Sequence, residues 1–189
     1  AKTFGKVTFG DSVVIIGPGS QGLCALAACL HSGGNPVIIQ GKDCDTTRLE
    51  LAKEFGAHHV INVDQQDPVD SVLDILPQGP DVVIETSGTP EGIQAAVKMV
   101  KKVGRIVNIG LSGGVETPVA FDELVWKSVT MIHGVGQAGN VPDAMKLINT
   151  GKFPFEKINN RTYSLENLEQ AIKDTENRPE GFIKAAIVF

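Results

Sequence analysis

The chain has 189 residues, 42% of them hydrophobic and 21% charged, which is typical of one domain with a sizeable core. No apolar run approaches the roughly 18 residues that a membrane-spanning helix needs, and the composition is unlike that of disordered or collagenous chains. Its 17 basic and 22 acidic residues give a net charge of −5, without a basic block that would neutralise a run of phosphates. We therefore expect neither a membrane span nor a nucleic-acid partner.

The first two thirds of the chain alternate short β-branched runs with segments of helical periodicity, which is typical of βαβ units around a parallel sheet. Some runs, such as residues 13–16, are apolar at every position, as in strands buried on both faces. The six predicted strands are Val13 to Ile16, Pro36 to Gln40, His59 to Asn62, Asp81 to Glu85, Arg105 to Ile109 and Val129 to His133. The predicted helices are Gln21 to His31, Thr46 to Phe55, Val69 to Leu76, Glu91 to Lys102 and a short one over Phe121 to Lys127.

From about Gln137 the pattern changes. A helix over Val141 to Asn149 is followed by a predicted Phe- and Lys-rich strand, a helix over Leu165 to Asp174 and a final strand over Phe182 to Val188. These elements do not continue the βαβ alternation, so the sequence predicts a doubly wound α/β domain followed by a small α/β appendage.

The strongest local motif is Gly17-Pro18-Gly19-Ser20-Gln21-Gly22, a G-x-G-x-x-G that follows the first strand and opens the first helix. Its glycines would allow the tight turn, the approach of a pyrophosphate and the close packing of helix on strand. The phosphates would meet the unpaired N–H groups at the helix N-terminus. The motif predicts a dinucleotide-binding site; the alternative is a glycine turn that only packs a helix.

In the doubly wound strand order 3-2-1-4-5-6, the ligand crevice opens at the carboxyl ends of strands one and four. Small residues are therefore expected after strand four, where the chain reads Thr86-Ser87-Gly88. Strand five similarly ends in Asn108-Ile109-Gly110. Such loops occur in many α/β turns, but their joint placement predicts that they line the crevice.

The end of strand two bears on the choice of cofactor. An acidic residue about 20 positions beyond the glycines would bind the ribose hydroxyls of NAD, but Gly41 stands there. Lys42 and Arg48 lie near enough in sequence to neutralise a 2′-phosphate, which favours NADP. Asp43 and Asp45 keep NAD open, since either would reach the ribose if the loop folds back.

No complete catalytic set is found in the sequence. The four histidines, His31, His58, His59 and His133, are not paired with Cys or Glu at metal-ligand spacing. Tyr163, the single tyrosine, has Asn167 four residues later where a short-chain dehydrogenase would have Lys. We therefore predict no catalytic and no metal-ligating residue in this chain.

Several stretches taken together resemble the medium-chain, zinc-dependent alcohol/polyol dehydrogenase family, from just before its cofactor-binding domain to its C-terminus. They are Gly10 to Gly19, Arg48 to Ala57, Asp81 to Gly88, Gly104 to Gly110, His133-Gly134 and Gly181 to Lys184. The resemblance implies a Rossmann domain over residues 11–136, with residues 1–10 and 137–189 as remnants of the catalytic domain. It also implies that the N-terminal catalytic region and its zinc ligands are absent here.

The resemblance further implies roles for individual residues. Lys184 would reach the cofactor pyrophosphate, and Thr86, Ser87 and Gly88 would lie near the nicotinamide ribose. The residues beside the nicotinamide would be Ile109, Gly110, Leu111, Val135 and Gly136. The full-length enzyme would transfer a hydride between NAD(P) and an alcohol or ketone with zinc polarising the oxygen, whereas this chain alone would be inactive. Val129 to His133 would form the edge of a homodimer, or of a dimer within a homotetramer.

The cysteines bear on the cellular location of the protein, and the first residues bear on whether the chain is part of a longer one. Cys24, Cys29 and Cys44 include no C-x-x-C pair, which favours a reduced, cytoplasmic location. The first residues contain no signal or transit pattern, and the chain begins with Ala1, so we expect a processed product or a piece of a longer protein. Two alternatives to the excised cofactor domain remain: a free-standing NAD(P)-binding or redox-sensing module, and a zinc-independent quinone or enoyl reductase of the same superfamily.

Overall fold

The computed structural model describes residues 1–134 and 139–189. Its main body is a six-stranded parallel sheet in the order β3-β2-β1-β4-β5-β6. The sequence therefore predicted the doubly wound fold class and strand order correctly. The strands are β1 (Val13–Ile16), β2 (Val37–Gly41), β3 (His59–Asn62), β4 (Val82–Glu85), β5 (Arg105–Asn108) and β6 (Thr130–His133).

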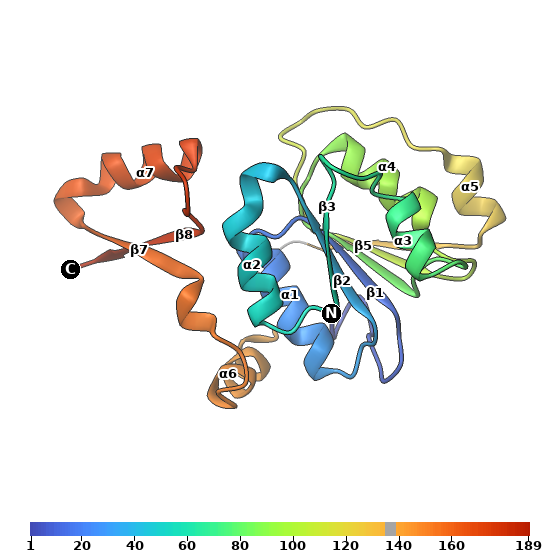
Figure 1. Ribbon diagram of the computed structural model, residues 1–189, viewed down its shortest axis with the longest axis horizontal. Helices are drawn as coiled ribbons and strands as arrows, with labels where there is room; N and C mark the ends of the chain where they lie inside the picture. Colours follow the sequence, from blue (N-terminus) through green and yellow to red (C-terminus); the bar gives the residue numbers. More distant parts are fainter. Residues whose placement is uncertain (135–138) are drawn as a thin grey trace.

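Helices cover both faces of the sheet, as Figure 1 shows, with α1 and α2 on one face and α3, α4 and α5 on the other. Because alternate strand residues point to opposite faces, Val13 and Ile15 join the core under α1 and α2, whereas Val14 and Ile16 join the core under α3 and α4. The helices are α1 (Ser20–His31), α2 (Thr46–Glu54), α3 (Asp70–Ile75), α4 (Pro90–Met99) and α5 (Phe121–Trp126).

The six strands of the main sheet begin and end within one residue of their predicted positions, whereas the final strand, β8 (Lys184–Val188), begins two residues after its predicted start. Helix α4 differs more, since it begins at Pro90, with Thr89 capping it through the Gly92 N–H, and ends at Met99 instead of Lys102. Val100 is already extended, and this exit from the helix brings the Lys101 ammonium to Asp81. The helix therefore ends three residues before its predicted end, ahead of the lysine that forms this ion pair.

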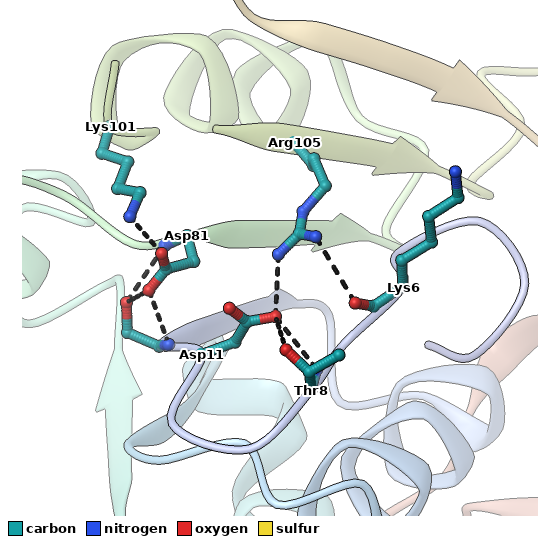
Figure 2. Close-up of polar contacts among 7 residues, drawn as sticks. Lys6, Thr8, Asp11, Asp81, Lys101 and Arg105 are labelled. Carbon is teal, nitrogen blue, oxygen red and sulfur yellow. Dashed lines mark hydrogen bonds and ion pairs between the residues drawn. The ribbon is translucent and has the colours of Figure 1, made fainter. Parts of the chain in front are cut away.

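Polar contacts at the amino ends of the strands tie the first residues of the chain to the sheet (Figure 2). The Asp81 carboxylate accepts hydrogen bonds from the Ser12 N–H at 2.8 Å and the Ser12 hydroxyl at 2.6 Å, and it pairs with Lys101. Arg105 donates to Asp11 at 2.8 Å and to the Lys6 carbonyl at 3.4 Å. These contacts lie at the opposite end of the strands from the glycine loop, so their role is structural.

Residues 139–189, the C-terminal segment, form a separate small unit beside α2, drawn in orange and red in Figure 1. Helix α6 (Val141–Asn149) has its predicted bounds, and the helix after residue 164 forms as the 3-10 turn Leu165–Asn167 followed by α7 (Leu168–Asn177). Strand β8 (Lys184–Val188) pairs in parallel with β7 (Asn159–Ser164). Among the described residues, no helix is long and apolar enough to cross a membrane.

The prediction of a Phe- and Lys-rich strand is wrong. That stretch forms the 3-10 turn Phe155–Lys157, and the polar strand β7 follows it. The aromatic rings are used for packing between units: Phe153 and Phe155 contact Phe55 at the end of α2, with ring centroids 6.0 and 5.5 Å from it. This aromatic cluster, together with an ion pair between Lys157 and Glu54, attaches the C-terminal segment to the sheet domain.

Candidate functional site

The glycine loop lies between β1 and α1, at the carboxyl end of the sheet. Gly17 has a φ of +97°, a left-handed conformation that favours glycine, and its N–H donates to the Gln40 carbonyl at 3.0 Å. A Cβ on Gly22 would stand 1.9 Å from the Gly17 carbonyl oxygen, so only glycine lets the helix pack here. By contrast, a Cβ on Gly19 would meet no atom within 4 Å. The loop therefore combines a tightly packed base with an open rim.

The rim of this loop opens into a cavity of about 610 Å³. Its walls are the glycine loop from Gly17 to Ser20, the loop after β2, Val63 and Pro68 after β3, the loop after β4 with the start of α4, and the C-terminal segment near Thr175 and Arg178 and from Phe182 to Ala185. Helix α1 begins at Ser20 without a side-chain cap on Gly19. Its first N–H groups and the positive end of its dipole are thus at the edge of the cavity, where they favour an anion.

The loop after β4 is built around a buried carboxylate. Glu85 is 0% exposed and accepts hydrogen bonds from the Ser87 N–H at 2.8 Å, the Ser87 hydroxyl and the Gly88 N–H. Burial raises the pKa of Glu85, and the hydrogen bonds from Ser87 and Gly88 oppose that rise. The Thr86 hydroxyl donates toward the carbonyls of Ile16 and Gly17, each at 2.9 Å. Glu85 and Thr86 therefore hold this loop against the glycine loop.

The predicted nicotinamide side follows β5. The N–H groups of Ile109 and Gly110 donate to the Glu85 carbonyl at 2.8 and 3.1 Å. A Cβ on Gly110 would lie 2.2 Å from the Gly88 nitrogen, so these two loops are in close contact. Leu111 is 79% exposed beside them.

At the end of β2, the structure changes the interpretation of Gly41 and Arg48, which the sequence indicates as residues that favour NADP. A Cβ on Gly41 would lie 2.6 Å from Cγ of Pro18, so packing on the glycine loop already accounts for a glycine here. Arg48 is buried, with one guanidinium nitrogen 2.7 Å from Asp45 Oδ1 and another donating to the Phe182 carbonyl at 3.1 Å. Both Gly41 and Arg48 line the cavity, as does the exposed Lys42.

The family profile of zinc-binding dehydrogenases matches residues 22–150 of the chain. The chain belongs to the zinc-binding dehydrogenase family. This membership confirms the resemblance to zinc-dependent alcohol and polyol dehydrogenases found in the sequence.

Three proteins illustrate the family relationship. Sorbitol dehydrogenase of Bacillus subtilis (strain 168) is 30% identical over 170 residues, covering 89% of this chain and 47% of that protein. L-threonine 3-dehydrogenase of Pyrococcus horikoshii is 37% identical over 127 residues, covering 67% of this chain and 36% of that protein. The crystal structure of benzyl alcohol dehydrogenase from Acinetobacter calcoaceticus matches with a TM-score of 0.86 at 30% identity, covering 97% of this chain and 51% of that one. The chain thus spans about half the length of these dehydrogenases, or less.

The cavity of this zinc-binding dehydrogenase chain brings together part of the site predicted from sequence. It is lined by Gly17, Gly19, Ser20, Gly41, Lys42, Arg48, Thr86, Ser87 and Lys184. Gln21, Gly22 and Gly88 do not line it, and neither do Ile109, Gly110 and Leu111. Val135 and Gly136 lie outside the described residues.

Two polar residues that line the cavity, Gln40 and Arg178, are not predicted from the sequence. Gln40 ends β2, donates to the Pro68 carbonyl at 2.6 Å and leaves its buried Oε1 without a hydrogen-bond partner among the described residues. A polar residue ending an apolar strand was an available signal for it. Arg178, after α7, also lines the cavity, and no local motif marks it, whereas Asp45, which lines the cavity as well, is among the residues that the sequence indicates.

No group of three or more His, Cys, Asp or Glu side chains is arranged to hold a metal ion within residues 1–134 and 139–189. The residues described here therefore do not fit the catalytic zinc from which the family takes its name. Cys29 is buried, and burial raises the pKa of its thiol to about 12, so it is unsuited to act as a ligand or nucleophile.

Proposed function

We propose that this chain is the nicotinamide-dinucleotide-binding portion of a zinc-type alcohol or polyol dehydrogenase, and that its preferred cofactor is NADP. Residues 11–136 would be the cofactor-binding domain, with residues 1–10 and 137–189 belonging to the catalytic domain. The observation that carries the proposal is the open cavity at the carboxyl ends of β1, β2 and β4, which adjoins the N-terminus of α1.

The residues of the glycine loop fit a bound pyrophosphate. The open space at Gly19 leaves room for phosphate oxygens, and the first N–H groups of α1 would donate to them. Lys184, on the opposite wall of the cavity, would neutralise charge. Thr86, Ser87 and Gly88 would lie near the nicotinamide ribose, and Ile109, Gly110, Leu111, Val135 and Gly136 near the nicotinamide. When bound, the dinucleotide would supply or accept the hydride at nicotinamide C4.

The choice of NADP rests on the absence of a free carboxylate at the end of β2. Gly41 has no side chain, and Asp45 is neutralised by Arg48. Asp43 is directed elsewhere, since its Oδ1 accepts hydrogen bonds from Asn62 at 2.6 Å and Gln65 at 2.9 Å. Lys42 is exposed at the cavity, where its ammonium would attract a 2′-phosphate.

Catalysis would need the remaining half of the enzyme. Within the described residues, the chain offers no metal-binding cluster beside the cavity, so we propose that the zinc ligands and most of the alcohol or ketone pocket belong to a separate N-terminal region. The exposed apolar side chains of α6 and α7, such as Met145 and Ile172, would then contact that region. The chain alone is expected to bind cofactor without turnover.

The edge strand β6 would mediate dimerisation. It ends the sheet and is only half buried, and exposed Phe121 and Trp126 lie on the helix just before it in sequence. We propose a homodimer, or a homotetramer of such dimers, which light scattering of the purified chain would test.

The proposal is tested by calorimetric titration of the chain with NADPH and NADH, with alcohol-dependent turnover assayed in the same samples. We expect NADPH to bind about tenfold or more tighter, and Lys42→Ala to reduce that preference several-fold. Lys53→Ala, an exposed lysine of α2 that does not line the cavity, is the matched control. Tighter binding of NADH would refute the choice of NADP, and failure of both nucleotides to bind would refute the assigned site. Turnover by the chain alone would show that the catalytic residues lie within it.

A further inference from the structure

The cavity has the opposite charge balance to the chain as a whole. Its charged lining residues are the cations Lys42, Arg48, Arg178 and Lys184 and the acids Asp45 and Glu91, so four positive charges face two negative ones. The whole chain, in contrast, carries a net charge of −5. A local excess of positive charge in an acidic protein favours an anionic ligand at that place.

Arg48 is not available to bind that ligand as a free cation. One of its nitrogens lies 2.7 Å from Asp45 and another 3.1 Å from the Phe182 carbonyl, and its side chain is 8% exposed. This arrangement joins the loop after β2 to the C-terminal segment. Arg48 therefore acts as a positioning residue that holds the two walls of the cavity together.

A second anchor fixes the same part of the C-terminal segment. The side chain of Asn160 donates to the Gly181 carbonyl at 2.5 Å and accepts from the Ile183 N–H at 3.0 Å. The Phe182 N–H in turn donates to the Pro179 carbonyl at 2.9 Å, which closes a tight turn directly after Arg178. Because the Phe182 carbonyl accepts from Arg48, which also pairs with Asp45, this turn is attached to the loop after β2, and both Arg178 and Lys42 line the cavity.

The backbone of Arg178 is unusual for its residue type. Arg178 ends α7 with a φ of +47°, a left-handed position at which glycine or asparagine is favoured, and it precedes a proline. An arginine at such a position is less favourable than glycine, because its Cβ crowds the backbone there. The Arg178 side chain is exposed at the cavity, where it supplies a positive charge that glycine would lack.

We propose that Arg178 is a specificity-determining residue, which binds the 2′-phosphate of the adenosine ribose from the C-terminal wall while Lys42 approaches it from the loop after β2. The inference rests on the proposed binding of NADP. It assigns to the C-terminal segment a part in cofactor selection that the glycine loop and strand β2 do not supply.

The test compares two nucleotide fragments that differ only in the phosphate concerned, 2′,5′-ADP and 5′-AMP, titrated calorimetrically into the 189-residue chain. We expect Arg178→Asn to weaken 2′,5′-ADP by about 5- to 20-fold, the range of a lost charge-assisted hydrogen bond, and to change 5′-AMP by less than about twofold. Arg178→Lys should restore part of the lost affinity. Asparagine suits the left-handed backbone, so the melting temperature should not fall.

Arg161→Asn is the matched control, because Arg161 is an exposed arginine of β7 that does not line the cavity. Unchanged binding of 2′,5′-ADP to Arg178→Asn, or equal weakening of both fragments, would overturn the role of Arg178. If the unaltered chain bound neither fragment, the proposed nucleotide site itself would fail. If it bound both with equal affinity, the choice of NADP would fail.

Discussion

The six-stranded domain and the C-terminal segment differ in how completely they bury their apolar side chains. Every residue of β1, β2 and β4 is buried, and their side chains fill two cores, one on each face of the sheet. In the C-terminal segment, α7 buries only Ala171, and the apolar residues of α6 and α7 at positions 141, 145, 148, 168 and 172 are between 42% and 50% exposed. The first region thus folds around its own core, whereas the second depends on its few contacts with the first.

Of those few contacts, the one between Arg48 and Phe182 lies in the wall of the cavity, whereas the aromatic rings lie outside it. The aromatic cluster of Phe55, Phe153 and Phe155 attaches the C-terminal segment at the end of α2. The contact from Arg48 to the Phe182 carbonyl attaches it again beside the start of the same helix. The cavity therefore lies between the six-stranded domain, which has its own core, and the C-terminal segment, which is attached by few contacts.

The largest expected effect is on the core of the six-stranded domain. Ile84→Ala, at a residue with 0% exposure, should lower the free energy of unfolding by about 3–5 kcal/mol through lost burial and a cavity. Ile172→Ala removes the same atoms from a residue that is 50% exposed and should cost less than about 1 kcal/mol. Urea unfolding of both variants measures the contrast, and equal losses would show that the C-terminal segment has a core of its own.

The glycine loop offers a matched pair that separates binding from stability. Gly22→Ala would press its Cβ against the Gly17 carbonyl and should impair both folding and nucleotide binding. Gly19→Ala places its Cβ in open space, so the melting temperature should be retained while NADPH binds about 10- to 100-fold more weakly, a loss of ~1.4–2.7 kcal/mol. Calorimetry and thermal unfolding check both. Undiminished binding by Gly19→Ala would mean that no phosphate approaches this loop.

Removal of a single aromatic ring from the cluster should be enough to loosen the attachment of the C-terminal segment. Phe153→Ala removes part of the aromatic cluster and is expected to cost about 1–2 kcal/mol, since Phe153 is only partly buried. Limited proteolysis should then cut within residues 150–189 while the six-stranded domain stays intact. Phe121→Ala, at an exposed position, is the control and should leave the cleavage pattern unchanged.

The amino-end contacts predict a small effect that depends on pH. Although burial alone would raise the pKa of Asp81, hydrogen bonds from Lys101 and Ser12 lower it below its ordinary value. The stabilisation is therefore present above the unfolded pKa of about 4 and is lost as pH falls through the lower folded value. Asp81→Asn should cost about 1 kcal/mol at pH 7, and the difference from the unaltered chain should shrink below about pH 4.

Urea unfolding at several pH values between 3 and 8 measures this difference. Asp74→Asn, at an exposed position on α3, should show no comparable loss. A loss for Asp81→Asn that persisted unchanged at low pH would contradict the role given to the Asp81 charge.

The sequence predicted the six-stranded domain well because its central strands β1, β2 and β4 are largely apolar and fully buried. Runs such as Val13 to Ile16 must be buried on both faces, and glycines at fixed spacing allow few alternatives for the turn after them. The C-terminal segment was harder. Strand β7 reads Asn-Asn-Arg-Thr-Tyr-Ser, without an apolar alternation. The stretch with Phe153 and Phe155 predicts a strand by its composition, because the packing partner of these rings, Phe55, is distant in sequence.

In the site, too, the features set by local sequence were predictable and those set by distant partners were not. The sequence predicts that Thr86, Ser87 and the glycine loop share a crevice, and Thr86, Ser87 and residues 17–20 of that loop do line one cavity. The partners of Arg48 were not predictable, since one is a carbonyl 134 positions away, and a backbone group carries no sequence signal. The packing of Gly41 on Pro18 likewise depends on how two loops meet, which no local motif records.

We propose that one cofactor molecule contacts both regions, and amide hydrogen exchange of the chain with and without NADPH tests this most directly. We predict increased protection in two separate stretches, the glycine loop at residues 17–22 and the C-terminal wall at residues 178–185. Protection confined to the six-stranded domain, or none in either stretch, would contradict the account.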